Sequence, residues 1–316
     1  MYDPENHLKC RFIGSLFGLA VGDALGATAE FKPRGTFEAV TDIVGGGVYM
    51  LEAGQWTDDT SMTLCLAESL IESQGMDLSH QLEKYLLWYE KGYLSSTGAC
   101  FGIGNTVKTA LETFKRVKEP YSGPKEPQFA GNGSLMRLAP VALLYSDDLN
   151  VCIKMCAESS KTTHRAQEAV EACEFFGSLI CGAASGLSKE KLLSKDYIKG
   201  VKQKGGVSWS PNIDAIANGS YKEKSAADIQ SSGYVIHTLE AALWAFYHST
   251  SFEDGLIKAV NLGDDADTTG AVYGQLAGAF YGFENIPQKW TAKIALKEII
   301  CDCANMLYAL HIQLKS

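Results

Sequence analysis

The sequence predicts an all-α protein that forms one compact multi-helix domain. Apolar side chains recur at intervals of three and four residues through most of the 316 positions. Strand-like alternation is confined to one short segment, and no change of composition divides the chain. Apolar residues make up 46% and charged residues 21% of the sequence, which is typical of globular proteins and excludes disorder. We therefore expect residues 1–316 to be a single domain.

The helical spacing defines the expected elements in order. Residues 79–91 illustrate it, because Leu82, Tyr85, Leu86 and Tyr89 fall on one helical face. By the same criterion the expected helices are 8–26, 58–73, 79–91, 104–116, 134–145, 149–159, 165–183, 232–248, 252–261, 267–281 and 290–311. The one strand candidate is 40–49, and 118–133 and 195–232 are expected to be loops.

Two of the expected helices carry glycine at every fourth position. A glycine inside a helix costs about 1 kcal/mol relative to alanine, so a row of them indicates that helix backbones pack closely. A membrane dimer motif is the alternative, but the segments are short and contain Asp23, Asp265 and Asp267. We expect both helices near the centre, with their acidic ends beside a common site. The glycines are Gly14, Gly18, Gly22 and Gly26 in one helix and Gly270, Gly274, Gly278 and Gly282 in the other.

Charge and cysteine content narrow the classes of partner. The net charge is −9 and no basic stripe is present, so nucleic-acid binding is not expected. No apolar run reaches the ~18 residues of a membrane helix, and the first residues lack a secretory signal. The nine cysteines lie mostly in apolar helical contexts without a CxxC pair, which is typical of reduced thiols. We expect a cytoplasmic monomer.

Two acidic segments, Thr57–Thr60 and Asp264–Gly270, each begin an apolar helix. Helix capping explains one Asp or Thr at such a position. Adjacent aspartates flanked by threonine, occurring twice, exceed what capping requires, because like charges this close repel unless a cation lies between them. Oxygen-only clusters suit Mg²⁺, Mn²⁺ or Ca²⁺. Both interpretations stay open at this point, with metal binding favoured.

Three further features have little meaning alone. Glu30 follows the first glycine-rich helix, and a single Glu is usually a solvated residue. The segment Gly131–Arg137 is a glycine turn before an expected helix, whose free N–H groups could receive a phosphate. His164 precedes another expected helix, and an isolated His more often has a capping or core role.

Taken together, these segments resemble the ADP-ribosylglycohydrolase family, and in particular its bacterial dinitrogenase-reductase-activating type. The resemblance covers residues ~10–285 and implies an all-α domain with a dinuclear magnesium or manganese centre. The ordered set is much more specific than any one motif. It comprises GDALGATAEF (22–31), GQWTDDTSM (54–62), CFGIGNT (100–106), GNGSLMRLAP (131–140), SKTTH (160–164), SGYVIHTLEAALWAF (232–246) and GDDADTTGA (263–271).

The resemblance also implies roles for particular residues. The metal ligands would be Thr57, Asp58, Asp59, Asp265, Asp267 and Thr268. Glu30 would be a ligand or catalytic carboxylate near the metals, and Asp58 and Asp59 would share in catalysis. Substrate contacts would come from a loop containing Gly102 and Gly104, from the diphosphate segment, from His164, and from Tyr234 against the nucleotide. The diphosphate segment consists of Gly131, Asn132, Gly133, Ser134, Leu135, Met136 and Arg137.

The expected activity is hydrolysis of the C1″ bond between ADP-ribose and an acceptor, either a modified protein or a small molecule, with two Mg²⁺ or Mn²⁺ ions. A binding or structural protein on the same scaffold, or a hydrolase of another ADP-ribose-like metabolite, are the alternatives. One residue departs from the resemblance. Arginine-directed bacterial relatives have an Asp in the loop where this chain has Gly102. We therefore expect ADP-ribosyl-arginine to be a poor substrate.

Overall fold

The computed structural model describes residues 4–315, and the described part contains fifteen α-helices and no strand. From the N-terminus these are α1 (Pro4–Gly26), α2 (Asp58–Glu72), α3 (Leu78–Lys91), α4 (Asn105–Val117), α5 (Ala139–Leu144), α6 (Leu149–Lys161), α7 (Gln167–Ala184) and α8 (Lys189–Leu192). They are followed by α9 (Lys195–Gly205), α10 (Pro211–Ala217), α11 (Val235–Tyr247), α12 (Phe252–Val260), α13 (Ala266–Tyr281), α14 (Gln288–Thr291) and α15 (Lys297–Lys315). The predicted all-α fold is confirmed.

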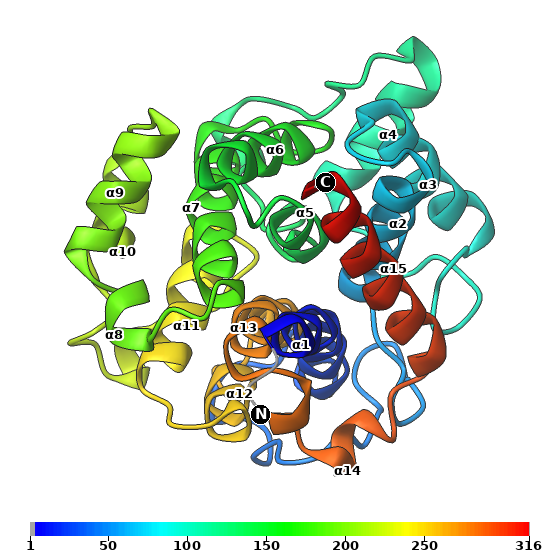
Figure 1. The fold of residues 1–316 in the computed structure, drawn as a ribbon. Coiled ribbons are helices and arrows are strands. Elements are labelled where there is room, and N and C mark those ends of the chain that lie inside the picture. Colours follow the sequence, from blue (N-terminus) through cyan, green and yellow to red (C-terminus); the bar gives the residue numbers. More distant parts are fainter. Residues whose placement is uncertain (1–3, 316) are drawn as a thin grey trace.

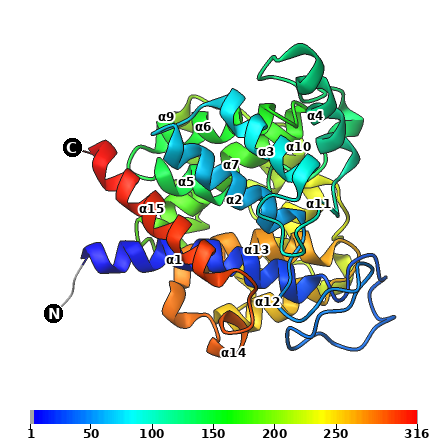
Figure 2. The same ribbon diagram turned by 90° about the vertical axis from the view of Figure 1, so that its right-hand side faces the viewer.

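Helices α1 and α13 form the centre of the molecule. Figures 1 and 2 show them side by side, with the other helices arranged around the pair. Helices α7, α11 and α12 pack against α13, whereas α15 packs against α1 and α2. Every residue of α13 from Ala266 to Ala279 is buried, so this helix has no solvent-facing side over that length.

The glycine rows explain how these two helices pack. A Cβ atom on Gly18 would lie 2.3 Å from the carbonyl oxygen of Gly274, and one on Gly22 would lie 2.0 Å from that of Gly270. Gly14 meets Gly278 in the same way. Partner numbers fall along α13 as they rise along α1, so the helices are antiparallel. The prediction of close helix packing is confirmed.

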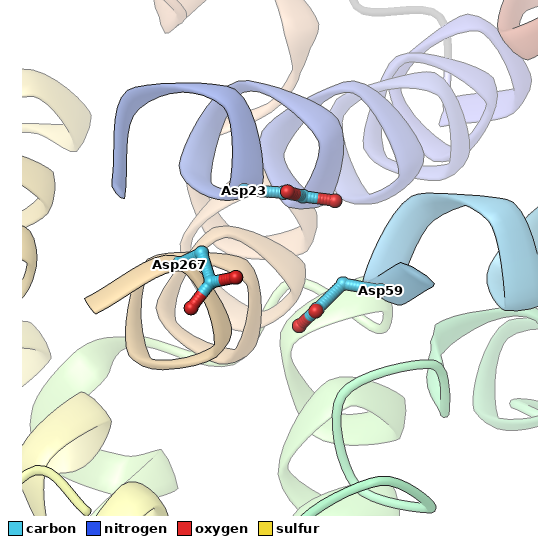
Figure 3. A group of neighbouring side chains, drawn as sticks. All are labelled: Asp23, Asp59 and Asp267. Atoms are coloured by element: carbon cyan, nitrogen blue, oxygen red, sulfur yellow. The ribbon is translucent and has the colours of Figure 1, made fainter. Parts of the chain in front are cut away.

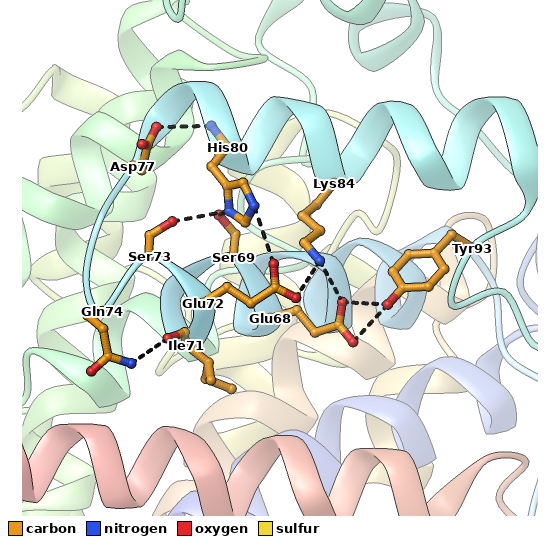
Figure 4. Close-up of polar contacts among 10 residues, drawn as sticks. All are labelled: Glu68, Ser69, Ile71, Glu72, Ser73, Gln74, Asp77, His80, Lys84 and Tyr93. Carbon is orange, nitrogen blue, oxygen red and sulfur yellow. Dashed lines mark hydrogen bonds and ion pairs between the residues drawn. The ribbon is translucent and has the colours of Figure 1, made fainter.

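Helix α2 is held against α3 by a charged cluster at the surface (Figure 4). Lys84 on α3 places its Nζ 3.2 Å from Glu68 and 2.7 Å from Glu72, both on α2. The Tyr93 hydroxyl donates to Glu68 Oε2 at 2.8 Å. These contacts lie toward the C-terminal end of α2, which leaves its acidic N-terminus for the centre of the molecule.

The predicted elements differ from the structure in five places, one of which is the short helix α8, Lys189–Leu192, which was not predicted. The strand at 40–49 is wrong, because Gly45, Gly46 and Gly47 all have positive φ and the segment forms a turn closed by one bridge from Gly46 to Leu51. The loop at 195–232 is wrong, since it contains α9 and α10. The helix at 134–145 begins only at Ala139, after a series of turns, and 290–311 divides into α14 and α15.

The remaining boundaries agree to within a few residues, and the predicted loop at 118–133 contains only the 3-10 turn Pro127–Phe129. Two similar turns occur at Ala226–Asp228 and Phe283–Asn285. All nine cysteines are free thiols, as expected. Within residues 4–315, no helix combines the length and apolar character that a membrane span requires.

Candidate metal and ADP-ribose site

Three helix ends meet at one point beside the central pair. The antiparallel packing brings the C-terminal end of α1 beside the N-terminus of α13, and the N-terminus of α2 points at both. Asp23, Asp59 and Asp267 each offer a carboxylate oxygen there, and these oxygens lie within 4.8 Å of one another. Figure 3 shows the three side chains converging from α1, α2 and α13 on one small space.

Asp23 is buried and uses both carboxylate oxygens to hold the start of α2. Its Oδ1 accepts hydrogen bonds from the Thr57 backbone N–H at 2.8 Å and the Thr57 hydroxyl at 2.9 Å. Its Oδ2 accepts from the N–H and hydroxyl of Thr60 at 3.0 and 2.6 Å. Thr57 precedes the first residue of α2 and makes no side-chain cap of its own, so a carboxylate from another helix replaces the usual cap.

Asp59 and Asp267 face each other across the Thr57 hydroxyl. The Thr57 Oγ1 atom lies 3.2 Å from Asp59 Oδ2 and 3.4 Å from Asp267 Oδ2, and Thr268 Oγ1 lies 3.5 Å from Asp59 Oδ2. The other oxygen of each aspartate, Oδ1, is buried without a hydrogen-bond partner. Glu30 is 6% exposed and its Oε2 is likewise buried and unpartnered.

Burial and mutual repulsion disfavour the charged forms of these acids. Burial first, then the neighbouring Asp23, raises the pKa of Asp58 and Asp59 well above the ordinary range. Burial followed by Glu30 does the same for the pKa of Asp267. Burial and Asp265 raise the pKa of Glu30 to about 8. Orphaned oxygens on buried, mutually repelling carboxylates fit hard divalent cations, which prefer oxygen ligands.

A cavity of about 250 Å³ opens beside the acidic cluster. The predicted site residues that line it are Glu30, Asp58, Gly102, Gly104, Gly131, Asn132, Gly133, Met136, His164, Asp265, Asp267 and Thr268. Phe31, Asn105, Thr106, Val107 and Gly233 complete the wall. Residues from widely separated parts of the chain therefore surround one space, as the motifs suggested. The predicted residues outside its lining are Thr57, Asp59, Ser134, Leu135, Arg137 and Tyr234.

The glycine turn is linked directly to the acidic cluster. Asn132 Nδ2 donates to Asp265 Oδ2 at 2.7 Å, while the Asn132 carbonyl accepts from the N–H groups of Leu135 and Met136. The segment is a turn and not the start of α5, which corrects the expectation of a helix N-terminus there. The N–H group of Gly133, which lines the cavity, has no partner among the described residues, so it remains able to donate to a phosphate oxygen.

Arg137 supports this turn from behind instead of lining the cavity. It is buried, donates from Nη1 to the Gly133 carbonyl at 2.8 Å, and lies over the Tyr85 ring at 4.5 Å. The expectation that Arg137 touches substrate is thus corrected, because its guanidinium is already engaged within the core. Ser134 and Leu135 are also buried outside the cavity lining.

His164 is a neutral hydrogen-bonding group in the cavity wall. Arg137 Nη2 donates to Thr163 Oγ1 at 2.6 Å, which leaves the Thr163 hydroxyl proton for His164 Nδ1 at 2.8 Å. Because His164 Nδ1 accepts this hydrogen bond, the ring proton is assigned to Nε2, which lies nearest Gly131. Burial and the Arg137 charge lower the pKa of His164 to about 3, so it faces the cavity as an uncharged donor.

Tyr234 lies beside the turn but outside the cavity lining. Its backbone pairs with Gly131, its hydroxyl donates to Glu168, and Asn212 Nδ2 lies 3.5 Å from the same hydroxyl. The His237 ring meets it edge-on at 5.0 Å. These contacts fix the orientation of a half-buried aromatic ring, and its stacking against a nucleotide stays a prediction.

Sequence reasoning overlooked two residues near the cluster. Asp23 was visible only as an acid in a glycine-rich helix, although a charged residue inside so close a helix contact is itself a signal of a buried partner. Tyr49 lies on the turn that was predicted as a strand, and burial, Glu30 and Asp58 raise the pKa of its hydroxyl. No periodicity points to a residue at the tip of a turn.

Comparisons with known proteins agree with this geometry. The ADP-ribosylglycohydrolase family model matches residues 4–315. The chain is 41% identical over 305 residues to "ADP-ribosylarginine hydrolase Tri1" of Serratia proteamaculans, covering 96% of this chain and 81% of that protein. It is 32% identical to the "ADP-ribosyl-[dinitrogen reductase] glycohydrolase" of Rhodospirillum rubrum, with 91% of each covered. A solved "ADP-ribosylglycohydrolase-related protein complex" matches with a TM-score of 0.84 and 40% identity, covering 97% of this chain and 99% of that one.

The family prediction is therefore confirmed, whereas the expected subtype is corrected. Identity to the arginine-named relative exceeds identity to the dinitrogen-reductase enzyme by nine percentage points, from 41% and 32% over nearly the same part of this chain.

Proposed function

The chain belongs to the ADP-ribosylglycohydrolase family, and we propose that it is an ADP-ribosyl-acceptor hydrolase whose acidic cluster holds two Mg²⁺ or Mn²⁺ ions. The observation that carries this proposal is the cavity itself. The cavity is lined both by buried carboxylates with unpartnered oxygens and by a glycine turn in which the Gly133 N–H has no partner among the described residues. ADP-ribose combines a hydroxyl-rich ribose with a diphosphate, so it matches both groups.

The residues of the site would have different roles, which follow from the chemistry of their side chains. Thr57, Asp58, Asp59, Asp265, Asp267 and Thr268 would hold the ions. When bound, such ions supply positive charge that binds vicinal hydroxyls and acidifies water. The turn Gly131–Met136 would receive the diphosphate, and His164 Nε2–H would donate to an oxygen of the ligand. Glu30 would orient the water that attacks C1″, because it lines the cavity and one of its carboxylate oxygens has no hydrogen-bond partner.

The reaction cleaves the bond from C1″ to the acceptor. Water supplies a hydroxyl group to C1″, the bonding electrons leave with the acceptor nitrogen or oxygen, and a proton follows them to complete the acceptor. In the metal-free protein, burial and Asp265 raise the pKa of Glu30 to about 8. Bound cations would lower this pKa, and the Glu30 carboxylate would then accept a proton from the attacking water.

We propose ADP-ribosyl-arginine as the acceptor-linked substrate, because two relatives above 40% identity are named ADP-ribosylarginine hydrolases. We give the identity to these two relatives more weight than the expectation, drawn from Gly102, that ADP-ribosyl-arginine is a poor substrate. Gly102 has φ of +75°, and a Cβ there would lie 2.7 Å from Asp58 Oδ1. A side chain at this position would displace a carboxylate of the cluster, so a different group must serve the acceptor.

A panel of ADP-ribosylated substrates tests the proposal. Wild-type protein is incubated with arginine-, serine- and O-acetyl-linked ADP-ribose, with Mg²⁺, Mn²⁺ or chelator, and free ADP-ribose is measured. We expect release from the arginine conjugate that chelator abolishes. Binding of ADP-ribose without release from any conjugate would instead favour a non-catalytic binding protein. A monomeric state and a cytoplasmic location stay predictions.

A further inference from the structure

Phe31 is an exposed aromatic residue at the edge of the cavity. It lines the cavity, follows Glu30 directly in the chain, and is 64% exposed. A phenylalanine stabilises a fold mainly through the apolar surface that it buries, and this residue buries little of it. The hydrophobic core therefore does not explain why a large aromatic side chain occupies this position.

The backbone of Phe31 does not explain the side chain either. Its φ is +59°, in the left-handed region, where glycine is favoured because it carries no Cβ atom. Two backbone hydrogen bonds to the segment before α13 fix this conformation. The Phe31 N–H donates to the Asp264 carbonyl at 2.6 Å, and the Asp264 N–H donates to the Lys32 carbonyl at 2.9 Å. A strained residue that is held in place beside a cavity is typical of a functional contact.

The surroundings of Phe31 suit a cationic group. The same cavity is lined by the carboxyl groups of Glu30, Asp58, Asp265 and Asp267, and none of the described residues that line it is a lysine or an arginine. The face of an aromatic ring attracts a cation through the quadrupole of the ring. This attraction does not depend on whether metal ions neutralise the neighbouring carboxylates, so Phe31 offers the cavity a separate contact for positive charge.

We propose that Phe31 is a specificity residue, whose ring stacks on the guanidinium group of the ADP-ribosylated arginine. The inference rests on the proposed function. There, Glu30 directs water at C1″, the atom that carries the acceptor, and consecutive Cα atoms are only about 3.8 Å apart. The acceptor is therefore the part of the substrate nearest to Phe31, whereas two riboses and the diphosphate separate the acceptor from the adenine. A planar guanidinium group is well suited to stacking on an aromatic face.

The experiment compares Phe31→Leu with Phe31→Tyr in the hydrolysis of ADP-ribosyl-arginine. Leucine has the same backbone strain and an apolar side chain but no ring, so the comparison isolates the aromatic face. We expect Phe31→Leu to lower kcat/KM about five- to tenfold, the loss typical of one cation–π contact. Phe31→Tyr should recover most of that loss. The affinity for free ADP-ribose, measured by titration with Mg²⁺, should stay unchanged in Phe31→Leu, because this ligand has no acceptor.

Leu296→Ala is the matched control. Leu296 is also a large apolar residue with positive φ, +51°, and is 39% exposed, but it lies outside the cavity lining. Removal of its side chain should leave the kinetics and the affinity for ADP-ribose at their wild-type values. A loss of activity in Phe31→Leu that Leu296→Ala does not share is then specific to the cavity.

Binding of intact conjugates gives a second readout, which needs no turnover. In the Glu30→Gln background, titration with arginine- and serine-linked ADP-ribose compares a cationic with a neutral acceptor. Phe31→Leu should weaken binding of the arginine conjugate about fivefold and leave that of the serine conjugate unchanged. Equal effects on both conjugates, weaker binding of free ADP-ribose, or wild-type kcat/KM in Phe31→Leu would overturn the proposal. Absence of hydrolysis of every conjugate by the wild-type protein would instead refute the proposed function, and the titrations would still decide on Phe31.

Discussion

Replacing Asp23 by Asn removes one of the two acceptor oxygens that hold the start of α2. The amide group would bring a donor to a place where the protein already presents donors, either the N–H and hydroxyl of Thr57 or those of Thr60. One pair of hydrogen bonds is lost, and a buried N–H is left without a partner. Because Thr57 borders both Asp59 and Asp267, we expect the damage to reach the metal site.

The loss of stability in Asp23→Asn can be estimated from the two hydrogen bonds that are lost. Each lost hydrogen bond to a buried carboxylate is worth about 1.5–3 kcal/mol, which gives a loss of about 3–6 kcal/mol for two. An opposing effect acts in the metal-free protein, since Asp23 is among the charges that raise the pKa of Asp58 and Asp59. Removing it relieves repulsion when no cation is present. The free energy of unfolding should therefore fall by about 3 kcal/mol or more in Mg²⁺ and by less in chelator.

Urea unfolding in Mg²⁺ and in chelator, with calorimetric titration of metal, measures these effects. Asp77→Asn is the control, because Asp77 is exposed and caps α3 by accepting from the N–H groups of Ser79 and His80, and Asn caps almost equally well. It should change stability by a few tenths of a kcal/mol at most. Unchanged stability of Asp23→Asn in both conditions would refute the capping argument. Loss of metal binding with full metal-free stability would make Asp23 a ligand.

The structure predicts four further experimental outcomes. In the metal-free protein the pKa of Glu30 is raised to about 8 and that of Asp23 to about 6, so the folded chain holds protons that the unfolded chain has released. The melting temperature of the metal-free protein should therefore fall as pH rises from 5 to 8. Mg²⁺ should make this pH dependence weaker. Asp267→Asn should weaken metal binding in titration and reduce turnover by orders of magnitude, and full activity in chelator would contradict it. ADP-ribose should raise the melting temperature only with divalent metal, since the ligand would bridge cluster and turn. Gly274→Ala should prevent folding or lower the melting temperature strongly, as its Cβ would lie 1.9 Å from the Gly18 carbonyl oxygen, and circular dichroism would report either result.

Helices that bury one face were predictable, and those that do not were missed. Helix α3 shows a clear apolar face because Leu82, Tyr85 and Trp88 are all buried. Helix α9 buries only Ile198 and Val201 among lysines and glycines, so its sequence pattern resembles that of a loop. The strand error at 40–49 has the opposite origin. Apolar Val44, Val48 and Met50 lie exposed on a turn, and exposure of apolar residues is not encoded in periodicity.

The site was predictable where the chain repeats a chemical signal. The glycine rows of α1 and α13 predict that the acidic ends of these two helices, including Asp267, lie beside a common site. The paired aspartates at the start of α2 repeat the same signal, and the family resemblance adds Asp59 to that site. The position of Asp23 in a glycine-rich helix indicates a buried partner, but nothing in the neighbouring sequence identifies that partner as the start of α2. Arg137 was misplaced for the related reason that a buried arginine and a ligand-binding arginine have the same sequence context.

The two sides of the cavity differ in how the chain specifies them, and this bears on how substrate choice can vary. The side that we propose for the metal ions and the diphosphate rests on α1, α2, α13 and the 131–137 turn, where each part is fixed by helix packing or by several hydrogen bonds. A change there disturbs the core, as the contact between Gly22 and Gly270 shows. The loop that contains Gly102 and Gly104 also lines the cavity, and the 45–51 turn packs against this loop through the Tyr49 and Phe101 rings. Both segments depend on glycines with positive φ, and we propose that they contact the acceptor. Substitutions of Tyr49 or its exposed neighbours can alter the acceptor without unfolding the metal site, so we expect specificity among related chains to depend on these segments.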